Sequence, residues 1–191
     1  MEIKLIKFLQ SAKNPFYDFI FTSVTHLASY IGFILVFATF LLIVFIKRKQ
    51  KTQRLLNYTI TFGITYGVGI LLNYILKVII NRPRPYEVDT SIVNALEAFG
   101  QSMPSGHTLS ATIICTFIVF GVYYFSKNKH LTIACAVLSG LFLVLTMISR
   151  MYLGQHYISD CIVGLVTAFV YSVLGIFIFL KLSKRKNDNN R

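Results

Sequence analysis

Three short polar clusters interrupt an otherwise apolar sequence, and their side chains are of the types that bind and transform anions. The first has the pattern K-x6-R-P and runs from Lys77 to Pro85. The second is P-S-G-H at 104–107, and the third has the pattern S-R-x5-H-x3-D from Ser149 to Asp160. Each cluster lies where an apolar stretch begins or ends. Because ionisable groups at membrane depth are costly, their presence at three such places predicts a functional site.

The cationic members of these clusters predict a site for a phosphate dianion. Lys77 and Arg84 are seven positions apart, about two helical turns, so both can face one side. Arg150 brings a third cation from a different loop. Ser105 and Gly106 lead into the next apolar stretch, where the N–H groups of a helix N-terminus attract an anion and glycine admits it close to the backbone. Arginine can also bind phosphate bidentately. We expect these five residues to hold the phosphate.

The other polar side chains of the clusters can transfer a phosphoryl group. His156 and Asp160 are four positions apart at the expected start of the last helix, so they are neighbours on one face. A carboxylate on one imidazole nitrogen fixes the tautomer and presents the other nitrogen as a nucleophile. His107 comes from a different helix and can protonate the leaving oxygen. We therefore expect His156 to be the nucleophile, Asp160 its partner and His107 the general acid.

Together the three patterns resemble the three-part signature of the type 2 phosphatidic acid phosphatase family, which includes the vanadium haloperoxidases. Eleven specified residues match in order between Lys77 and Asp160. The resemblance implies a phosphatase that needs no metal or other cofactor, forms a phosphohistidine, and uses the catalytic and phosphate-binding residues named above. The size and the R-P-R-P stretch are similar to those of small bacterial members that act on undecaprenyl diphosphate or phosphatidylglycerol phosphate. Six-span members begin with an apolar helix, a feature that the N-terminal residues here do not match.

The composition predicts a protein that lies mostly within a membrane. Hydrophobic residues make up 55% of the 191 positions and charged residues only 14%, whereas soluble domains have about 25% charged residues. This excludes an ordinary soluble enzyme, a disordered tail and a disulfide-rich secreted module. The net charge of +12 does not indicate nucleic-acid binding, because the basic residues occur in short runs between apolar stretches. Cys115, Cys135 and Cys161 lie in apolar runs and are expected to be buried thiols.

Five apolar segments are long enough to cross about 30 Å of hydrocarbon, which requires about 20 helical residues. Backbone groups in lipid must form hydrogen bonds within their own segment, so these segments are predicted to be helices. We therefore expect an all-α, polytopic membrane helix bundle. The predicted transmembrane helices are Ala28–Ile46, Leu55–Ile80, His107–Phe125, Leu131–Ser149 and Tyr157–Leu180.

Residues 1–27 are less apolar and are predicted to form interfacial helices. The first part places lysines on one side of a helical wheel and apolar side chains on the other, the pattern of a helix in the membrane surface. Phe16–Leu27, which follows Pro15, is too short to span a membrane alone. A sixth span is the alternative. The apolar side of the first helix consists of Leu5, Phe8, Leu9 and Ala12.

The distribution of basic residues predicts the topology. If the five helices alternate in direction, the loops 47–54 and 126–130 and the tail 181–191 lie on one side, and they hold 12 of the 19 Lys and Arg residues. The positive-inside rule places this side, with the C-terminus, in the cytoplasm. The polar clusters are then expected at the extracytoplasmic face of the cell membrane. The whole chain is expected to form one domain, with 28–180 as its transmembrane core.

These observations favour a membrane phosphatase whose partner is a lipid phosphate substrate, with no nucleic acid and no obligatory protein partner. A transporter or channel for phosphorylated anions is the alternative, since intramembrane charges also mark such pathways. A metal hydrolase that uses His107, His156 and a carboxylate would place its cation among four basic residues, which is electrostatically unfavourable. Arg82 lies outside the signature and is expected to contact lipid headgroups.

Overall fold

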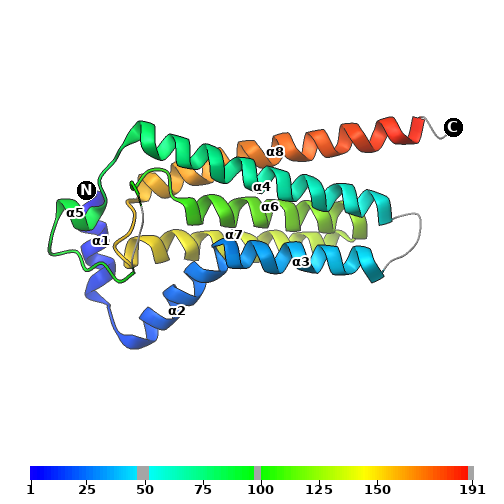
Figure 1. Ribbon diagram of the computed structural model, residues 1–191. Helices are drawn as coiled ribbons and strands as arrows, with labels where there is room; N and C mark the ends of the chain where they lie inside the picture. Colours follow the sequence, from blue (N-terminus) through cyan, green and yellow to red (C-terminus); the bar gives the residue numbers. More distant parts are fainter. Residues whose placement is uncertain (47–51, 97–99, 189–191) are drawn as a thin grey trace.

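The protein is a bundle of long, roughly parallel and antiparallel helices (Figure 1). A computed structural model describes residues 1–46, 52–96 and 100–188, and the regular structure within these ranges is α-helical throughout. The all-α fold predicted from the sequence is therefore confirmed. The helices are α1 (Glu2–Ser11), α2 (Pro15–Leu27), α3 (Tyr30–Ile46), α4 (Thr52–Ile80), α5 (Pro85–Val88), α6 (Gly106–Ser126), α7 (Lys129–Tyr152) and α8 (Ile158–Asp188).

Four stretches among the described residues are long and apolar enough to cross a membrane, and a bent pair of helices forms a fifth. The pair consists of α2 and α3, which meet at an angle of 52°. Gly32 permits this bend, because a Cβ atom there would lie 1.9 Å from the carbonyl oxygen of Leu27. Four of the five predicted spans are thus present as single stretches, and the one predicted at Ala28–Ile46 is present if α2 and α3 count as one bent span. The four single stretches are Gln53–Val88, Gly106–Ser126, Lys129–Tyr152 and Ile158–Lys184.

The outside of the bundle is apolar, as expected for helices that face lipid. Large aliphatic and aromatic side chains such as Leu138 and Phe177 are 65% and 63% exposed. Hydroxyl groups are buried instead, and many of them bond within their own helix, as Thr112 does to the carbonyl oxygen of Thr108 at 2.7 Å. A soluble protein shows the opposite arrangement.

Helix α6 forms the centre of the bundle, and nearly all of its first half is buried. An aromatic core lies between α4, α6 and α8, with Tyr58 and Phe62 fully buried. The Tyr58 hydroxyl donates a hydrogen bond to the carbonyl oxygen of Phe117, so α4 is joined to α6 by a polar as well as an apolar contact. This core fixes the long helices relative to one another, and thereby the positions of the loops at their ends.

The first helix packs on the end of the bundle rather than on a membrane surface alone. Ile6 is fully buried against Ile92, Met151 and Tyr157, whereas Phe8 is 72% exposed. The amphipathic pattern therefore predicted the helix correctly, but part of its apolar side contacts the protein. Figure 1 shows α1 at the same end of the bundle as α5.

Helix α8 continues to Asp188, eight residues beyond the predicted end of the last span at Leu180. Residues 181–188 are therefore helical rather than an irregular tail. At the same end of the molecule, Arg54 lies near Lys127 and Lys129, as the predicted topology requires. Five of the basic residues used to predict that topology lie outside the described residues: Lys47, Arg48, Lys49, Lys51 and Arg191.

Candidate active site

The three polar clusters of the sequence meet at one end of the bundle. Lys77 is in the last turn of α4 and Arg84 directly precedes α5, whereas His107 is in the first turn of α6. Arg150 is in the last turn of α7, and Asp160 is in the first turn of α8. In Figure 1 these helix ends lie on the side of the molecule where α1 and α5 pack.

Backbone hydrogen bonds fasten the clusters to one another. The N–H of Ser105 donates to the carbonyl oxygen of Asp160 at 3.0 Å, and the N–H of Ser102 donates to the carbonyl oxygen of Arg82 at 2.8 Å. Gly164 allows α8 to approach this point closely, because a Cβ atom there would lie 2.7 Å from the Ser105 carbonyl oxygen. The start of α6 is thus held directly by both other clusters.

Six of the eight predicted site residues line a single cavity of about 580 Å³. Both imidazole rings are among them, so the two histidines face the same space. Ser105 and Asp160 do not line the cavity and are fully buried behind it. The Ser105 hydroxyl caps α6 by accepting a hydrogen bond from the Thr108 N–H at 3.4 Å. The six lining residues are Lys77, Arg84, Gly106, His107, Arg150 and His156.

Two of the cations are held in place by neutral acceptors. Lys77 donates to the carbonyl oxygens of Gln101 and Ser102, the latter at 3.3 Å. Arg84 donates to the carbonyl oxygen of Gly100 at 2.9 Å and to the side-chain oxygen of Gln155 at 3.0 Å. Because carbonyl and amide oxygens orient a cation without cancelling its charge, both groups remain able to attract an anion.

Arg150 is almost fully buried, and its guanidinium is incompletely bonded. One terminal nitrogen donates to the Thr25 hydroxyl at 3.1 Å. Its buried Nε atom has no hydrogen-bond partner among the described residues. A buried cation with an unpaired N–H donor is energetically unfavourable unless an anion accepts that hydrogen bond and balances the charge. The cavity therefore presents the electrostatic and hydrogen-bonding features of an anion site.

His156 lies beside Asp160, but the contact is loose. The distance from Nδ1 of His156 to the nearer oxygen of Asp160 is 3.5 Å, longer than an ordinary hydrogen bond, and Nδ1 has no partner that meets hydrogen-bond geometry among the described residues. That carboxylate oxygen accepts hydrogen bonds from the Tyr157 N–H at 2.9 Å and from the Ser102 hydroxyl. The carboxylate is thus held next to the ring by Tyr157 and Ser102.

Burial lowers the pKa of His156 to about 3, against the opposing effect of Asp160. The nearby charges of Lys77, Arg84 and Arg150 act in the same direction as burial. The imidazole is therefore neutral at neutral pH and keeps a lone pair, as a nitrogen nucleophile requires.

Arg82 is placed differently from the sequence interpretation. One terminal nitrogen donates to Asp160 at 2.7 Å and to the Ser159 hydroxyl at 2.6 Å, and the other donates to Glu2 at 2.8 Å. The guanidinium carbon lies 4.0 Å from the centre of the Tyr157 ring. The sequence interpretation, contact with lipid headgroups, did not include these bonds to protein carboxylates, which the Arg82 side chain makes while it is 26% exposed.

Sequence analysis also missed three polar residues that hold the site together. Thr25 bonds to Arg150, Gln155 bonds to Arg84, and Ser102 bonds to Asp160. Gln155 and Ser102 lie inside or next to the clusters, so their polarity in apolar surroundings was a usable signal. Thr25 offered no signal, because it is far from the clusters in sequence.

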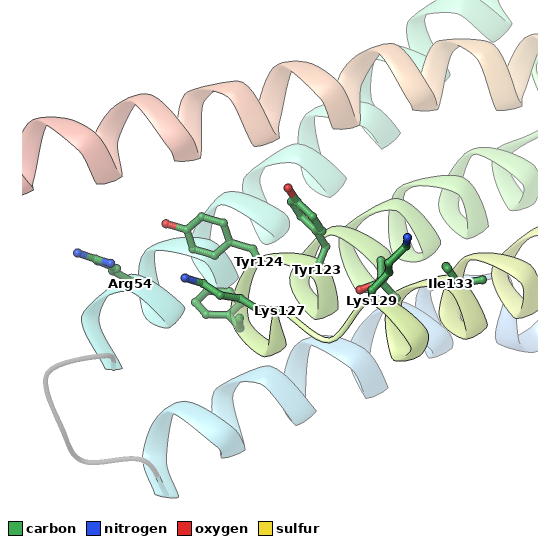
Figure 2. A pocket seen from close by; sticks show the side chains of 8 residues that line it. Arg54, Tyr123, Tyr124, Lys127, Lys129 and Ile133 are labelled. Atoms are coloured by element: carbon green, nitrogen blue, oxygen red, sulfur yellow. The ribbon is translucent and has the colours of Figure 1, made fainter.

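A larger cavity, of about 790 Å³, lies at the opposite end of the bundle. Figure 2 shows its basic and tyrosine side chains, among them Arg54, Lys127 and Tyr124. None of the described residues that line it is a histidine or a carboxylate, so these residues offer no group suited to act as a nucleophile or a general acid at neutral pH. The cavity that contains both histidines is therefore the better candidate for catalysis.

Within the ranges that the structure describes, no group of three or more His, Cys, Asp or Glu side chains is arranged to hold a metal ion. The two histidines of the site are accompanied by cations rather than by further carboxylates in the cavity wall.

Curated relatives of this chain are lipid phosphatases by name. Phosphatidylglycerophosphatase B of Bacillus subtilis is 29% identical over 158 residues, which cover 80% of this chain and 70% of that protein. Undecaprenyl-diphosphatase BcrC of the same organism is 27% identical over 173 residues, which cover 91% of this chain and 78% of that protein.

Solved structures show the same fold. A transmembrane PAP2-type phosphatidylglycerolphosphate phosphatase from Bacillus subtilis superposes with a TM-score of 0.79 at 22% identity, over 94% of this chain and 85% of that one. LpxE of Aquifex aeolicus superposes with a TM-score of 0.67 at 24% identity, over 92% and 94% of the two chains. The profile of the PAP2 superfamily matches residues 54–184, which include all three polar clusters. This chain therefore belongs to the PAP2 superfamily.

Proposed function

We propose that the protein is a membrane lipid phosphatase that hydrolyses a lipid phosphate or diphosphate through a phosphohistidine at His156. One observation carries the proposal: His156, His107 and three cations line the same cavity, at the end of a bundle whose exterior is apolar. Family membership and the relatives' names support the same class of reaction.

The phosphate group fits between the cations and the start of α6. Lys77, Arg84 and Arg150 can each contact one of its oxygens, and Arg150 has a buried N–H to offer. Gly106 lines the cavity at the N-terminus of α6, where the backbone adds further positive potential. Since phosphoryl transfer depends mainly on positioning and charge stabilisation, this set supplies most of what the reaction needs.

The reaction then proceeds in two balanced steps. The neutral imidazole of His156 attacks phosphorus, and the bond from phosphorus to the leaving oxygen breaks. His107, whose protonated form the negative charge of the bound phosphate favours, gives that oxygen its proton. A water molecule next attacks the phosphohistidine and loses a proton to His107, which releases inorganic phosphate and restores both rings. His107 thus acts as acid in the first step and as base in the second.

The cavity opens toward lipid, which supports a lipid substrate. Tyr30 and Tyr74 line it and are each 67% exposed on the outer surface of the bundle, and Ile70 beside them is 39% exposed. These residues belong to α3 and α4, so the opening lies between two membrane helices. An acyl or prenyl chain can remain in the bilayer while its phosphate reaches the cations.

Undecaprenyl diphosphate and phosphatidylglycerol phosphate are the proposed substrates, by analogy with the two Bacillus subtilis relatives. The excess of basic residues at the opposite end of the bundle supports an active site at the extracytoplasmic face and a cytoplasmic C-terminus.

Phosphate release by the purified protein tests this function. The substrates are undecaprenyl diphosphate, phosphatidylglycerol phosphate, phosphatidic acid and diacylglycerol diphosphate in mixed micelles, each with and without a strong chelator. We expect release from at least one of the first two, unchanged by the chelator and inhibited by vanadate. The proposal is contradicted if no lipid releases phosphate, or if the His156→Ala variant releases it as fast as the unaltered protein.

A further inference from the structure

Arg82 joins two carboxylates that come from distant parts of the chain. Its guanidinium donates to Asp160 at 2.7 Å through one terminal nitrogen and to Glu2 at 2.8 Å through the other. Glu2 is in the first turn of α1, whereas Asp160 is in the first turn of α8 and is fully buried. The result is a continuous chain of charge-assisted hydrogen bonds from the start of the polypeptide to the partner of His156.

Glu2 also binds the helix that carries Asp160. Its second carboxylate oxygen accepts a hydrogen bond from the backbone N–H of Ser159 at 2.9 Å. Because this N–H belongs to the first turn of α8, the negative charge of Glu2 interacts favourably with the helix dipole. The Ser159 hydroxyl accepts a further bond from Arg82 at 2.6 Å. Two residues of α8 are therefore fixed by the same pair of side chains.

Because Arg82 binds both Glu2 and Asp160, Glu2 influences the contact between Asp160 and His156. One oxygen of Asp160 binds Arg82, and the other lies 3.5 Å from Nδ1 of His156. If Glu2 lost its charge, Asp160 would be the one charged carboxylate left on Arg82 among the described residues, and it would be drawn toward Arg82. With Glu2 in place, two carboxylates share the guanidinium of Arg82. Glu2 then offsets part of the Arg82 charge, so the negative potential of Asp160 at the imidazole is stronger.

We propose that Glu2 and Arg82 are positioning residues for phosphoryl transfer. Helix α1 then contributes to catalysis, because it supplies Glu2. The proposal rests on the function proposed above, since it assigns to both residues the task of orienting Asp160 against a nucleophilic His156. Neither residue lines the cavity, so both act through Asp160 and not on the substrate.

The kinetic constants of Glu2→Gln test the proposal, because the substitution keeps the side chain's shape but removes its charge. We expect kcat to fall about tenfold, as when a residue that orients a functional histidine is lost. KM should stay within about twofold, because the phosphate-binding cations are unchanged. Arg82→Lys, which keeps the charge but cannot span both carboxylates, should lower kcat in the same way.

Lys7→Gln is the matched control. Lys7 is on the same helix and forms an ion pair with Asp89 at 2.8 Å. Among the described residues, no hydrogen bond or ion pair joins Lys7 to Glu2, Arg82 or Asp160. If the ion pairs of α1 served only to hold this helix against the bundle, loss of the Lys7–Asp89 pair and loss of the Glu2–Arg82 pair should lower kcat equally. We expect the Lys7→Gln variant to keep both kcat and KM. Thermal unfolding of all three variants measures their folding separately.

Three results would overturn the positioning role: an unchanged kcat for Glu2→Gln, an equal loss of kcat for Lys7→Gln, or a change confined to KM. Each presupposes that the unaltered protein releases phosphate and that His156→Ala does not. If that condition itself fails, the proposed function fails, and the positioning role falls with it. The two failures are therefore distinguished by the unaltered protein and His156→Ala alone.

Discussion

Arg150, at the end of α7, donates a hydrogen bond of 3.1 Å to the hydroxyl of Thr25 in α2. The first, bent pair of membrane helices thus contacts a phosphate-binding residue directly, through Thr25. The Thr25 hydroxyl is also 3.0 Å from that of Ser149, so it connects α2 to two consecutive residues of the third cluster.

Replacing Thr25 with valine should weaken substrate binding. The change keeps the shape of the side chain but leaves a buried Arg150 donor without its acceptor, at a cost of about 1–3 kcal/mol. We expect KM for the preferred lipid to rise about tenfold, since tenfold corresponds to roughly 1.4 kcal/mol. Steady-state kinetics provide the measurement. Thr61→Val is the control, because the Thr61 hydroxyl donates to a carbonyl oxygen of its own helix, that of Asn57 at 2.8 Å.

Gly106→Ala should lower activity without destabilising the fold. A Cβ atom there meets only the Asn73 side chain, at an ordinary contact distance of 3.5 Å, yet it would stand where we expect the phosphate to approach α6. A displacement of about 1 Å at a reacting group can cost about a hundredfold in rate. The rate of phosphate release should therefore fall, whereas the melting temperature should stay the same.

Gly164→Ala, in contrast to Gly106→Ala, should lower stability. Its Cβ atom would lie 2.7 Å from the Ser105 carbonyl oxygen, so α8 must shift and stability should fall by about 1–3 kcal/mol. Should Gly106→Ala retain full activity, the expected path of the phosphate past α6 would be wrong.

The buried, neutral state of His156 should make stability depend on pH. Burial lowers its pKa from 6.5 in the unfolded chain to about 3 in the folded protein. Between these values the unfolded chain binds more protons at this residue, so folding becomes less favourable as the pH falls. The unaltered protein should therefore lose more stability than His156→Asn between pH 7 and about pH 5. Thermal unfolding of both at each pH gives the comparison, and equal losses would show that His156 does not titrate as proposed.

His107→Ala should affect monophosphates more than diphosphates. A diphosphate expels phosphate, which leaves without much protonation, whereas a lipid monophosphate expels an alkoxide that needs a proton. We expect hydrolysis of phosphatidic acid to fall by about 10²–10⁴-fold, and hydrolysis of undecaprenyl diphosphate to fall less. Parallel assays of the two substrates decide the matter. Equal losses would remove His107 from the role of general acid.

Much of the fold could be predicted from the sequence, because the thickness of a membrane fixes how long an apolar helix must be. The predicted span His107–Phe125 differs from α6 by one residue at each end. The break between α2 and α3 was also placed correctly, near Ala28. The extension of α8 to Asp188 was missed, because the charged residues after Leu180 end the apolar pattern without ending the helix.

The site was predictable in part, because its chemically active residues occur in compact clusters. Hydropathy and spacing brought Lys77, His107 and His156 to one membrane face, and the structure places all three around one cavity. The contacts that support them were not predictable. Glu2 and Arg82 are 80 positions apart, and hydrogen bonds between such distant side chains depend on how the helices pack, which leaves no periodic signal in the sequence.

The account depends most on His156 as the nucleophile that attacks phosphorus. Trapping the covalent phosphohistidine tests this directly. The purified protein is mixed with lipid carrying a ³²P-labelled terminal phosphate, quenched within the first turnovers, digested and mapped. We predict an acid-labile, base-stable label on the peptide that contains His156, and no label in His156→Ala. A label on any other residue, or rapid hydrolysis by His156→Ala, would contradict the account.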